Sequence, residues 1–212
     1  MPRSVDELLS WIYEPVERDV LAEKYDTWAS TYDDDLGAGY RVSPIAAARA
    51  LARALPGRDS RILDAGAGTG LCGEELHELG WTNVEAVDMS AEMLAVSRRK
   101  GVYRDYHRCD LEEDAEFFPA ASFDGIVTTG VITRNHAGHR SVRNMDRWLK
   151  PDGAVVVAIL RDYLESQEEL REVFTTVPWT LETVNTVTIF DSTEVGIYTY
   201  RKRKPGPQDA ER

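Results

Sequence analysis

The segment RILDAGAGTGLCGEEL, residues 61–76, combines an apolar run, an acid and a glycine-rich turn followed by a helix-like stretch. Gly66, Gly68 and Gly70 form a G-x-G-x-G pattern, whereas Gly68, Gly70 and Gly73 form the G-x-G-x-x-G pattern of dinucleotide-binding loops. A loop of this kind brings backbone N–H groups close to a bound nucleotide or nucleoside. The glycines alone do not decide which of these ligands is bound.

Acidic residues at the ends of the apolar runs argue against a dinucleotide. Asp64 lies two residues before Gly66, where a carboxylate repels a pyrophosphate and attracts an ammonium or sulfonium group. Asp88 ends the next run, VEAVD, and is placed to accept hydrogen bonds from two ribose hydroxyls. Asp110 ends a third run, where it can accept an adenine amino proton while Leu111 packs on the ring. Together they describe a nucleoside with a positive, phosphate-free tail, which is S-adenosylmethionine.

The elements that must position these residues alternate between strand and helix from residue 61 onward, which is typical of an α/β protein. We expect strands at residues 61–65, 84–87, 106–109, 123–129 and 154–160, then a hairpin of strands 179–190 and 194–201. Helices are expected at 71–79, from the N-cap Ser90 to about residue 100, and at 141–149 and 165–174, with a turn at 151–153. Such near-continuous apolar strands predict a parallel sheet covered on both faces, with ligands beyond the carboxyl ends of its strands.

The first sixty residues are predicted to be mostly helical. Residues 4–34 read as helices broken at Pro15, residues 33–44 as a loop, and residues 44–55 as an alanine-rich helix. Tyr25, Trp28 and Tyr32 recur at helical spacing and share one face. Such a stripe is typical of core packing and is also compatible with a cover over a ligand.

The composition restricts the partners. The net charge of −12 comes from 25 Lys+Arg against 37 Asp+Glu and repels phosphate backbones, so we expect no nucleic-acid partner. No apolar run approaches the ~18 residues of a membrane span, and the N-terminal residues lack the apolar core of a secretory signal. Cys72 and Cys109 suit a reducing compartment and have no Cys or His at metal-ligand spacing. We therefore expect a cytoplasmic protein without membrane partners or a metal site.

Five runs, ILDAGAGTG, VDMSAEML, RCDL, FDGIVTTGVI and WLKPDGAVVV, occur between roughly residues 60 and 160. In order and spacing they resemble the class I S-adenosylmethionine-dependent methyltransferases. YDTWASTYDDDL, GYRVSPIAA and KGVY resemble a narrower group, the methyltransferase-like family named after the Williams–Beuren syndrome chromosome region. The resemblance implies a three-layer Rossmann-like α/β fold, with a mostly parallel seven-stranded sheet and a C-terminal antiparallel hairpin. It further implies a helical lid or cap at residues 1–57, a cofactor-binding core at 58–204 and a disordered tail at 205–212.

At matching positions the resemblance implies a cofactor site. The residues along the methionine tail would be Asp64, Ala65, Gly66, Gly68 and Gly70. Asp88 would hold the ribose with Met89 beside the adenine, and Asp110 and Leu111 would meet the base. Thr129 would face the sulfonium. The lid would contribute Tyr25, Trp28 and Tyr32.

The class of methyl acceptor is restricted mainly by motifs that the sequence lacks. VTTGVI, at the end of the fourth strand, lacks the Asn/Asp-Pro-Pro-Tyr of methyltransferases that act on exocyclic base nitrogens, and there is no Pro-Cys nucleophile. We expect a small-molecule oxygen or nitrogen acceptor and a monomer or homodimer. His136, in the loop after that strand, is either a general base or a surface residue. A cofactor-binding protein without methyl transfer, an NAD-dependent reductase and a protein methyltransferase remain alternatives.

Overall fold

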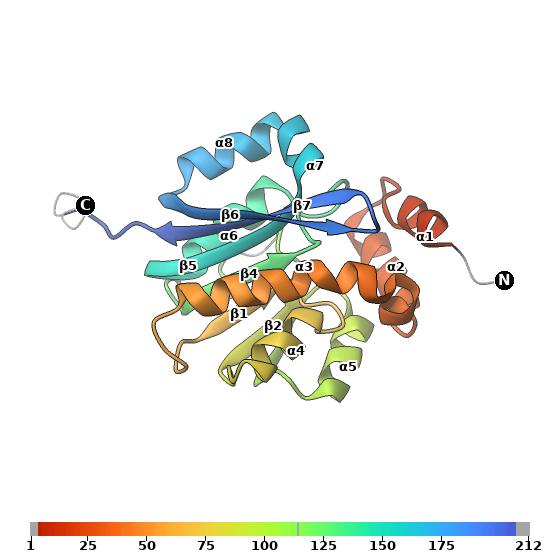
Figure 1. The fold of residues 1–212 in the computed structure, drawn as a ribbon, viewed down its shortest axis with the longest axis horizontal. Coiled ribbons are helices and arrows are strands. Elements are labelled where there is room, and N and C mark those ends of the chain that lie inside the picture. The colour runs from red at the N-terminus through yellow and green to blue at the C-terminus, as the bar shows by residue number, and fades with distance from the viewer. Residues whose placement is uncertain (1–3, 114, 207–212) are drawn as a thin grey trace.

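A computed structural model describes residues 4–113 and 115–206 as one sheet with helices on both of its faces (Figure 1). The strands are β1 (Ile62–Ala65), β2 (Val84–Asp88), β3 (Asp105–Arg108), β4 (Phe123–Thr129), β5 (Leu149–Leu160), β6 (Trp179–Ile189) and β7 (Thr193–Lys202). The helices are α1 (Val5–Ile12), α2 (Arg18–Trp28), α3 (Tyr32–Ala54), α4 (Leu71–Glu78), α5 (Ala91–Lys100), α6 (His139–Trp148), α7 (Arg161–Ser166) and α8 (Glu168–Thr176).

The seven strands lie in the order β3-β2-β1-β4-β5-β7-β6. β1 pairs in parallel with β2 and β4, whereas β7 runs antiparallel to both β5 and β6. The chain therefore changes direction across the sheet between β1 and β4, where an open α/β sheet leaves a crevice at the carboxyl ends of its strands. The predicted mostly parallel sheet with a C-terminal antiparallel hairpin is confirmed.

Each face of the sheet has its own apolar core. Leu51 of α3 and Leu76 of α4 pack on one face, and Met145 and Trp148 of α6 with Val173 of α8 pack on the other. β1 is buried at every position because helices cover both of its faces. This double cover explains why the sequence shows continuous apolar runs instead of alternation.

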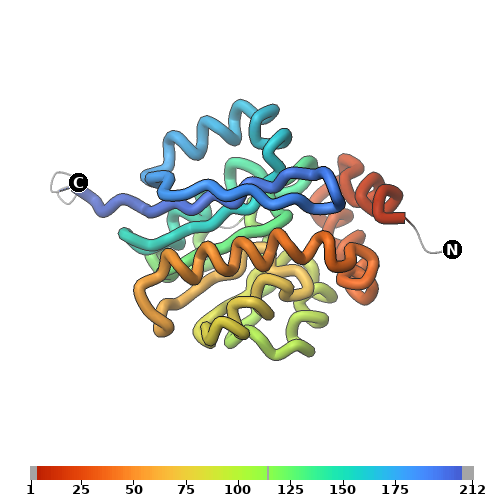
Figure 2. The backbone as a smooth tube through the Cα atoms, in the orientation of Figure 1, coloured from red at the N-terminus to blue at the C-terminus, as the bar shows by residue number. Residues whose placement is uncertain are grey.

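α1 and α2 form a cap whose core is separate from those of the sheet. Leu8, Ile12, Leu21 and Trp28 pack together with the first turn of α3, at the end of the molecule opposite the end of β7 (Figure 2). Ser4 and Glu7 form a capping box that starts α1. The remainder of α3 packs on the sheet. The division into a lid at residues 1–57 and a core at 58–204 remains a prediction.

The loop predicted at residues 33–44 is wrong, because α3 extends through this range. Gly37 alone departs from helical geometry, at φ 62° and ψ −167°. Asp33, in the first turn, accepts hydrogen bonds from Thr69 Oγ1 at 2.5 Å and Lys100 Nζ at 2.8 Å. These partners lie 36 and 67 residues away in sequence, so the stabilisation of this turn is tertiary.

Two further boundaries differ from those predicted. The turn at 151–153 lies inside β5 as a bulge, because the pairing with β4 passes from Phe123–Leu149 directly to Gly125–Ala154. The helix expected at 165–174 is two helices, α7 and α8, separated by Gln167 in an extended conformation. Gln167 is neither glycine nor proline, so no local signal marks this break. The predicted disordered tail lies largely outside the described residues.

Candidate active site

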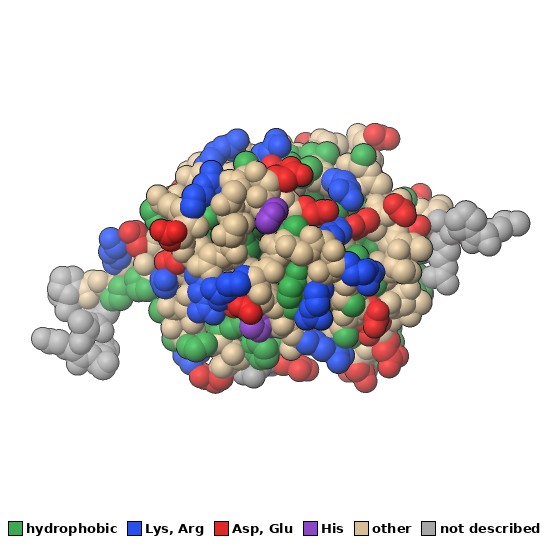
Figure 3. Space-filling view, turned by 90° about the horizontal axis from the view of Figure 1, so that it is seen from below, with side chains coloured by type: hydrophobic (Ala, Val, Ile, Leu, Met, Phe, Trp, Pro, Cys, Tyr) green, Lys and Arg blue, Asp and Glu red, His purple; other side chains and the backbone are tan. Residues whose placement is uncertain are grey.

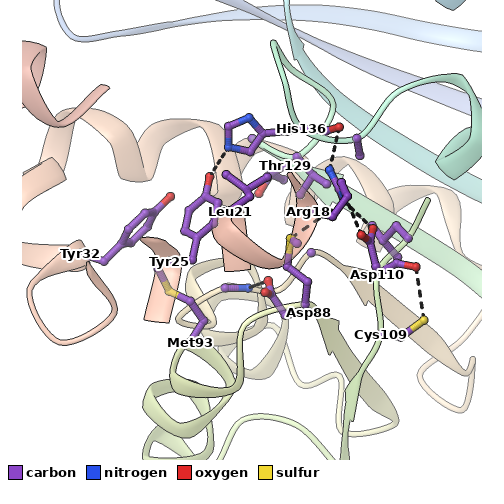
Figure 4. Close-up of a pocket in the computed structure, with 17 residues that line it drawn as sticks. Arg18, Leu21, Tyr25, Tyr32, Asp88, Met93, Cys109, Asp110, Thr129 and His136 are labelled. Atoms are coloured by element: carbon purple, nitrogen blue, oxygen red, sulfur yellow. Dashed lines mark hydrogen bonds and ion pairs between the residues drawn. The ribbon is translucent and has the colours of Figure 1, made fainter. Parts of the chain in front are cut away.

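A pocket opens at the carboxyl ends of β1, β2, β3 and β4 and is covered by α2 (Figure 4). Ten of the residues predicted from sequence line it: Tyr25, Tyr32, Gly66, Gly68, Asp88, Met89, Asp110, Leu111, Thr129 and His136. They come from the cap and from four separate strand ends, and the fold brings them to a single cavity.

The glycine loop forms one wall of the pocket. Gly66 and Gly68 have φ values of +79° and +53°, which side chains on L-residues rarely tolerate. A methyl group at Gly66 would also overlap the Val131 side chain. Hydrogen bonds from the N–H groups of Gly66 and Ala67 to the Val87 carbonyl, at 2.8 and 3.0 Å, tie the loop to β2. Backbone can approach a ligand closely here because no side chain intervenes.

Asp88 ends β2, and backbone N–H groups of two different loops hold the two oxygens of its carboxylate. Oδ2 accepts from the Gly68 N–H at 2.8 Å, and Oδ1 accepts from the Ser90 N–H at 2.9 Å. Each oxygen keeps a lone pair for a further donor. Burial raises the pKa of Asp88 to about 6, so the ionised form gains from any donor or cation that enters the pocket.

Asp64 lies behind the glycine loop and is not part of the pocket lining. Its side chain is buried and accepts a hydrogen bond at 2.5 Å from the Tyr103 hydroxyl, which in turn accepts from the Gly73 N–H at 3.1 Å. Burial raises the pKa of Asp64 to about 7, and the nearby charge of Asp88 contributes in the same direction. Asp64 therefore acts on the pocket through its charge and through the position of the loop.

Three other predicted residues also lie outside this lining. Ala65 is buried in β1, Gly70 is the N-cap of α4, and Trp28 packs in the core of the cap. Trp28 donates through Nε1 to Asp35 Oδ2 at 2.9 Å. Of the aromatic stripe, Tyr25 and Tyr32 face the pocket, while Trp28 contributes to both the cap core and a neighbouring cavity.

Arg18 was missed by sequence reasoning, although it makes several contacts in the pocket. Its guanidinium binds both carboxylate oxygens of Asp110, with Nε 2.6 Å from Oδ2, and Nη1 donates to the His136 carbonyl at 2.9 Å. The Asp110 carboxylate, predicted to meet the adenine amino group, is thus already paired with the cap. A usable signal exists in the sequence, because Arg18 lies seven residues before Tyr25 on the same helical face.

His136 is held in one neutral tautomer. Its Nδ1 lies 2.6 Å from the Arg134 carbonyl and must carry the proton, because a carbonyl oxygen can only accept. Nε2 is then an acceptor for the Tyr25 hydroxyl at 2.8 Å. Burial lowers the pKa of His136, so the ring is neutral at pH 7 and its basic lone pair points at Tyr25.

The strand order of the sheet, the glycine loop and Asp88 at the end of β2 are together typical of the fold of class I methyltransferases. A family model described as a methyltransferase domain matches residues 63–157. Human Methyltransferase-like protein 27 is 31% identical over 140 residues, covering 64% of this chain and 57% of that protein. The malonyl-[acyl-carrier protein] O-methyltransferase of Enterobacter lignolyticus is 29% identical over 158 residues, covering 74% and 59%.

A solved structure extends the likeness to nearly the whole chain. The Burkholderia thailandensis 1,6-didemethyltoxoflavin-N1-methyltransferase, solved with 1,6-didemethyltoxoflavin and S-adenosylhomocysteine, matches with a TM-score of 0.64 at 19% identity. The match covers 96% of this chain and 93% of that one. Residues 63–157 match the methyltransferase domain, and the chain has the fold of the class I S-adenosylmethionine-dependent methyltransferases, as predicted. It spans less than three fifths of the length of the two curated relatives.

Proposed function

We propose that the protein transfers a methyl group from S-adenosylmethionine to an oxygen or nitrogen of a small-molecule acceptor. The observation that carries this is Asp88, whose two oxygens are oriented by the Gly68 and Ser90 N–H groups beside the glycine loop. That arrangement suits the two hydroxyls of a ribose. Relatives named as methyltransferases support the reaction class.

The charges around the pocket favour a cationic, phosphate-free ligand over NAD. Asp64 and Asp88 are both buried, and each is easier to ionise when a positive group is near. The single cationic side chain among the described lining residues, Arg18, is paired with Asp110 and is not free for a phosphate. The residues present therefore fit an ammonium and a sulfonium better than a pyrophosphate.

When bound, the cofactor supplies a methyl carbon activated by its sulfonium, so the chain has to bind, orient and remove a proton. Tyr25 and His136 are arranged for the last task. The Tyr25 hydroxyl can take the proton of an acceptor while passing its own to His136 Nε2, at 2.8 Å. α2 contributes Arg18, Leu21 and Tyr25 to the wall of the pocket and would keep water from the reacting groups.

A small acceptor is favoured over nucleic acid by the acidic composition. On the face shown in Figure 3, Lys and Arg side chains are interspersed with Asp and Glu and do not form a continuous basic surface. Among the described helices, none is both long and apolar enough to cross a lipid bilayer. Cytoplasmic location, the absence of a metal and a monomeric or homodimeric state remain predictions.

Calorimetric titration with S-adenosylmethionine, S-adenosylhomocysteine and NAD in parallel tests the cofactor. We expect micromolar binding of the first two, on the order of −8 kcal/mol, and no heat from NAD. Asp88→Asn should weaken binding of S-adenosylhomocysteine at least tenfold, because hydrogen bonds to a charged acceptor are lost. Asp105→Asn, an exposed change on β3, is the matched control. Binding of NAD alone would refute the proposal.

Methyl transfer itself is tested by incubating the protein with S-adenosylmethionine and pooled small-molecule acceptors, then measuring S-adenosylhomocysteine and methylated products by mass spectrometry. We expect product formation that depends on an added acceptor. Tight cofactor binding with no turnover across the pool would favour a binding protein. Methylation of a peptide in competition would favour a protein methyltransferase.

A further inference from the structure

A second cavity adjoins the cofactor pocket, and we propose that it is the acceptor site and takes an uncharged aromatic molecule that carries a hydrogen-bond acceptor for the Thr133 hydroxyl. This inference rests on the proposed function. The two cavities share Tyr25, Tyr32 and Gly130 in their walls. A molecule in the second cavity would therefore present one end at the junction, beside the Tyr25–His136 pair.

The wall of this cavity comes from segments far apart in sequence. α1, α2 and α3 provide one side, and the ends of β4 and β5 with the β6–β7 hairpin provide the other. Leu160 ends β5, and Ile189 and Val195 flank the hairpin turn. The cavity thus lies between the cap and the sheet, where closing the cap would enclose a ligand.

Aromatic rings dominate the part of the wall nearest the junction. Trp28 and Tyr32 meet edge-to-face at 4.7 Å between ring centroids, and Tyr32 and Tyr40 meet in the same way at 6.1 Å. Rings in this arrangement leave faces and edges free for a further aromatic ring. The rest of the wall is mostly aliphatic, with residues such as Ile132 and Ile159.

No residue lining the cavity carries a charge at neutral pH. The lining contains no Asp, Glu, Lys, Arg or His, and burial raises the pKa of Tyr25, Tyr32 and Tyr40, so their hydroxyls stay neutral. A carboxylate or ammonium on the acceptor would lose its hydration and gain no counter-ion. The wall therefore selects against charged acceptors.

Thr133 is the polar group that points to a ligand. Its residue is 4% exposed and lines the cavity, yet its Oγ1 has no hydrogen-bond partner within the described part of the chain. A buried hydroxyl without a partner is unfavourable. A carbonyl or ether oxygen on the acceptor would satisfy it. Thr128, on β4, has an equally unpaired hydroxyl but lines neither cavity, so it is a matched control.

The test uses two isosteric pairs of probes that differ in charge. These are 4-hydroxybenzamide against 4-hydroxybenzoate, and 6-hydroxy-2-naphthamide against 6-hydroxy-2-naphthoate. Binding to the full chain is measured by ligand-observed NMR, with and without S-adenosylhomocysteine. We expect at least one amide to bind, and its carboxylate partner to bind at least tenfold more weakly.

Variants locate the binding. Thr133→Val should weaken amide binding about fivefold or more, whereas Thr128→Val should leave it unchanged. Ser43→Leu, which places bulk in the cavity wall, should reduce binding of the naphthamide most. Thermal melting identifies any variant that has lost its fold. Binding is then compared among the variants that remain folded.

The outcomes separate this inference from the proposed function. Equal binding of amides and carboxylates, equal loss in Thr133→Val and Thr128→Val, or no amide binding while S-adenosylhomocysteine binds would overturn the acceptor site alone. If S-adenosylhomocysteine does not bind, the proposed function fails, whatever the aromatic probes do.

Discussion

Asp64→Asn should stabilise the unliganded protein at alkaline pH. The Asp64 side chain is buried, and burial raises its pKa to about 7 from the ordinary value of 3.8. At about 1.4 kcal/mol for each tenfold change in the ionisation constant, this difference amounts to about 4 kcal/mol. Asn can still accept the hydrogen bond from Tyr103, so the substitution mainly removes the cost of ionisation.

The direction of the pH effect on stability follows from how many protons the folded and unfolded states bind. Between pH ~4 and ~7 the folded protein holds a proton on Asp64 that the unfolded chain has lost, so the free energy of unfolding falls as pH rises across this interval. Above pH 7 Asp64 is ionised in both the folded and the unfolded protein, so the free energy of unfolding falls no further from this group. The Asp64→Asn variant has no ionisable group at this position, so its free energy of unfolding does not show this decrease with pH. The two proteins should therefore be equally stable near pH 4, and the variant should be more stable by up to ~4 kcal/mol at pH 8.

Urea denaturation from pH 4.5 to 8 measures the effect, with Asp59→Asn as the control because Asp59 is exposed. Asp88, whose pKa is also raised, titrates in both proteins, so the difference between the profiles reports Asp64 together with its coupling to Asp88. The same variant should bind S-adenosylmethionine more weakly, because a negative charge behind the glycine loop is lost. Parallel stability profiles with equal values at pH 8 would refute the reasoning.

Three further predictions concern the loop, the cap and the proton path. Gly66→Ala should abolish cofactor binding and cost at least ~2 kcal/mol of stability, because the new methyl group overlaps Val131 at a positive φ. Arg18→Met should cost about 1–2 kcal/mol and speed dissociation of S-adenosylhomocysteine in stopped flow, because Asp110 loses its partner on the cap. Tyr25→Phe should lower the rate of methyl transfer about 100-fold in single-turnover assays, with little change in cofactor affinity.

Each of these changes has a control or a result that contradicts it. Gly57→Ala, in open space on the surface, should leave binding and stability unchanged, and equal losses in both glycine variants would tell against the loop argument. Arg143→Met, on the exposed face of α6, should leave the dissociation rate unaltered. If Arg18→Met behaves in the same way, the ion pair does not hold the cap. An unchanged transfer rate in Tyr25→Phe would remove Tyr25 and His136 from the proton path.

Local patterns in the sequence determined most of the strands and helices that form the sheet and its two helical layers. The alternation of strand-like and helix-like segments predicted all seven strands. Central strands such as β1 and β4 are largely apolar because helices cover both of their faces, whereas most positions of β3 and β6 are exposed or only partly buried. Ser90 predicted the start of α5, and its hydroxyl accepts from the Met93 N–H as an N-cap does. Strand-end position likewise placed Asp88 in the pocket, because the carboxyl ends of parallel strands meet at one edge.

Contacts between distant residues were decided only by the tertiary structure. Asp64 meets Tyr103 across 39 residues and Arg18 meets Asp110 across 92, and no local pattern encodes either pair. For the same reason, the helical turn at Asp33 was predicted to be a loop. The second cavity is formed by cap, strand ends and hairpin together, and only the packing of the folded chain brings these segments to one wall. Spacing along the chain predicts which residues end an element, whereas their partners depend on how the elements pack.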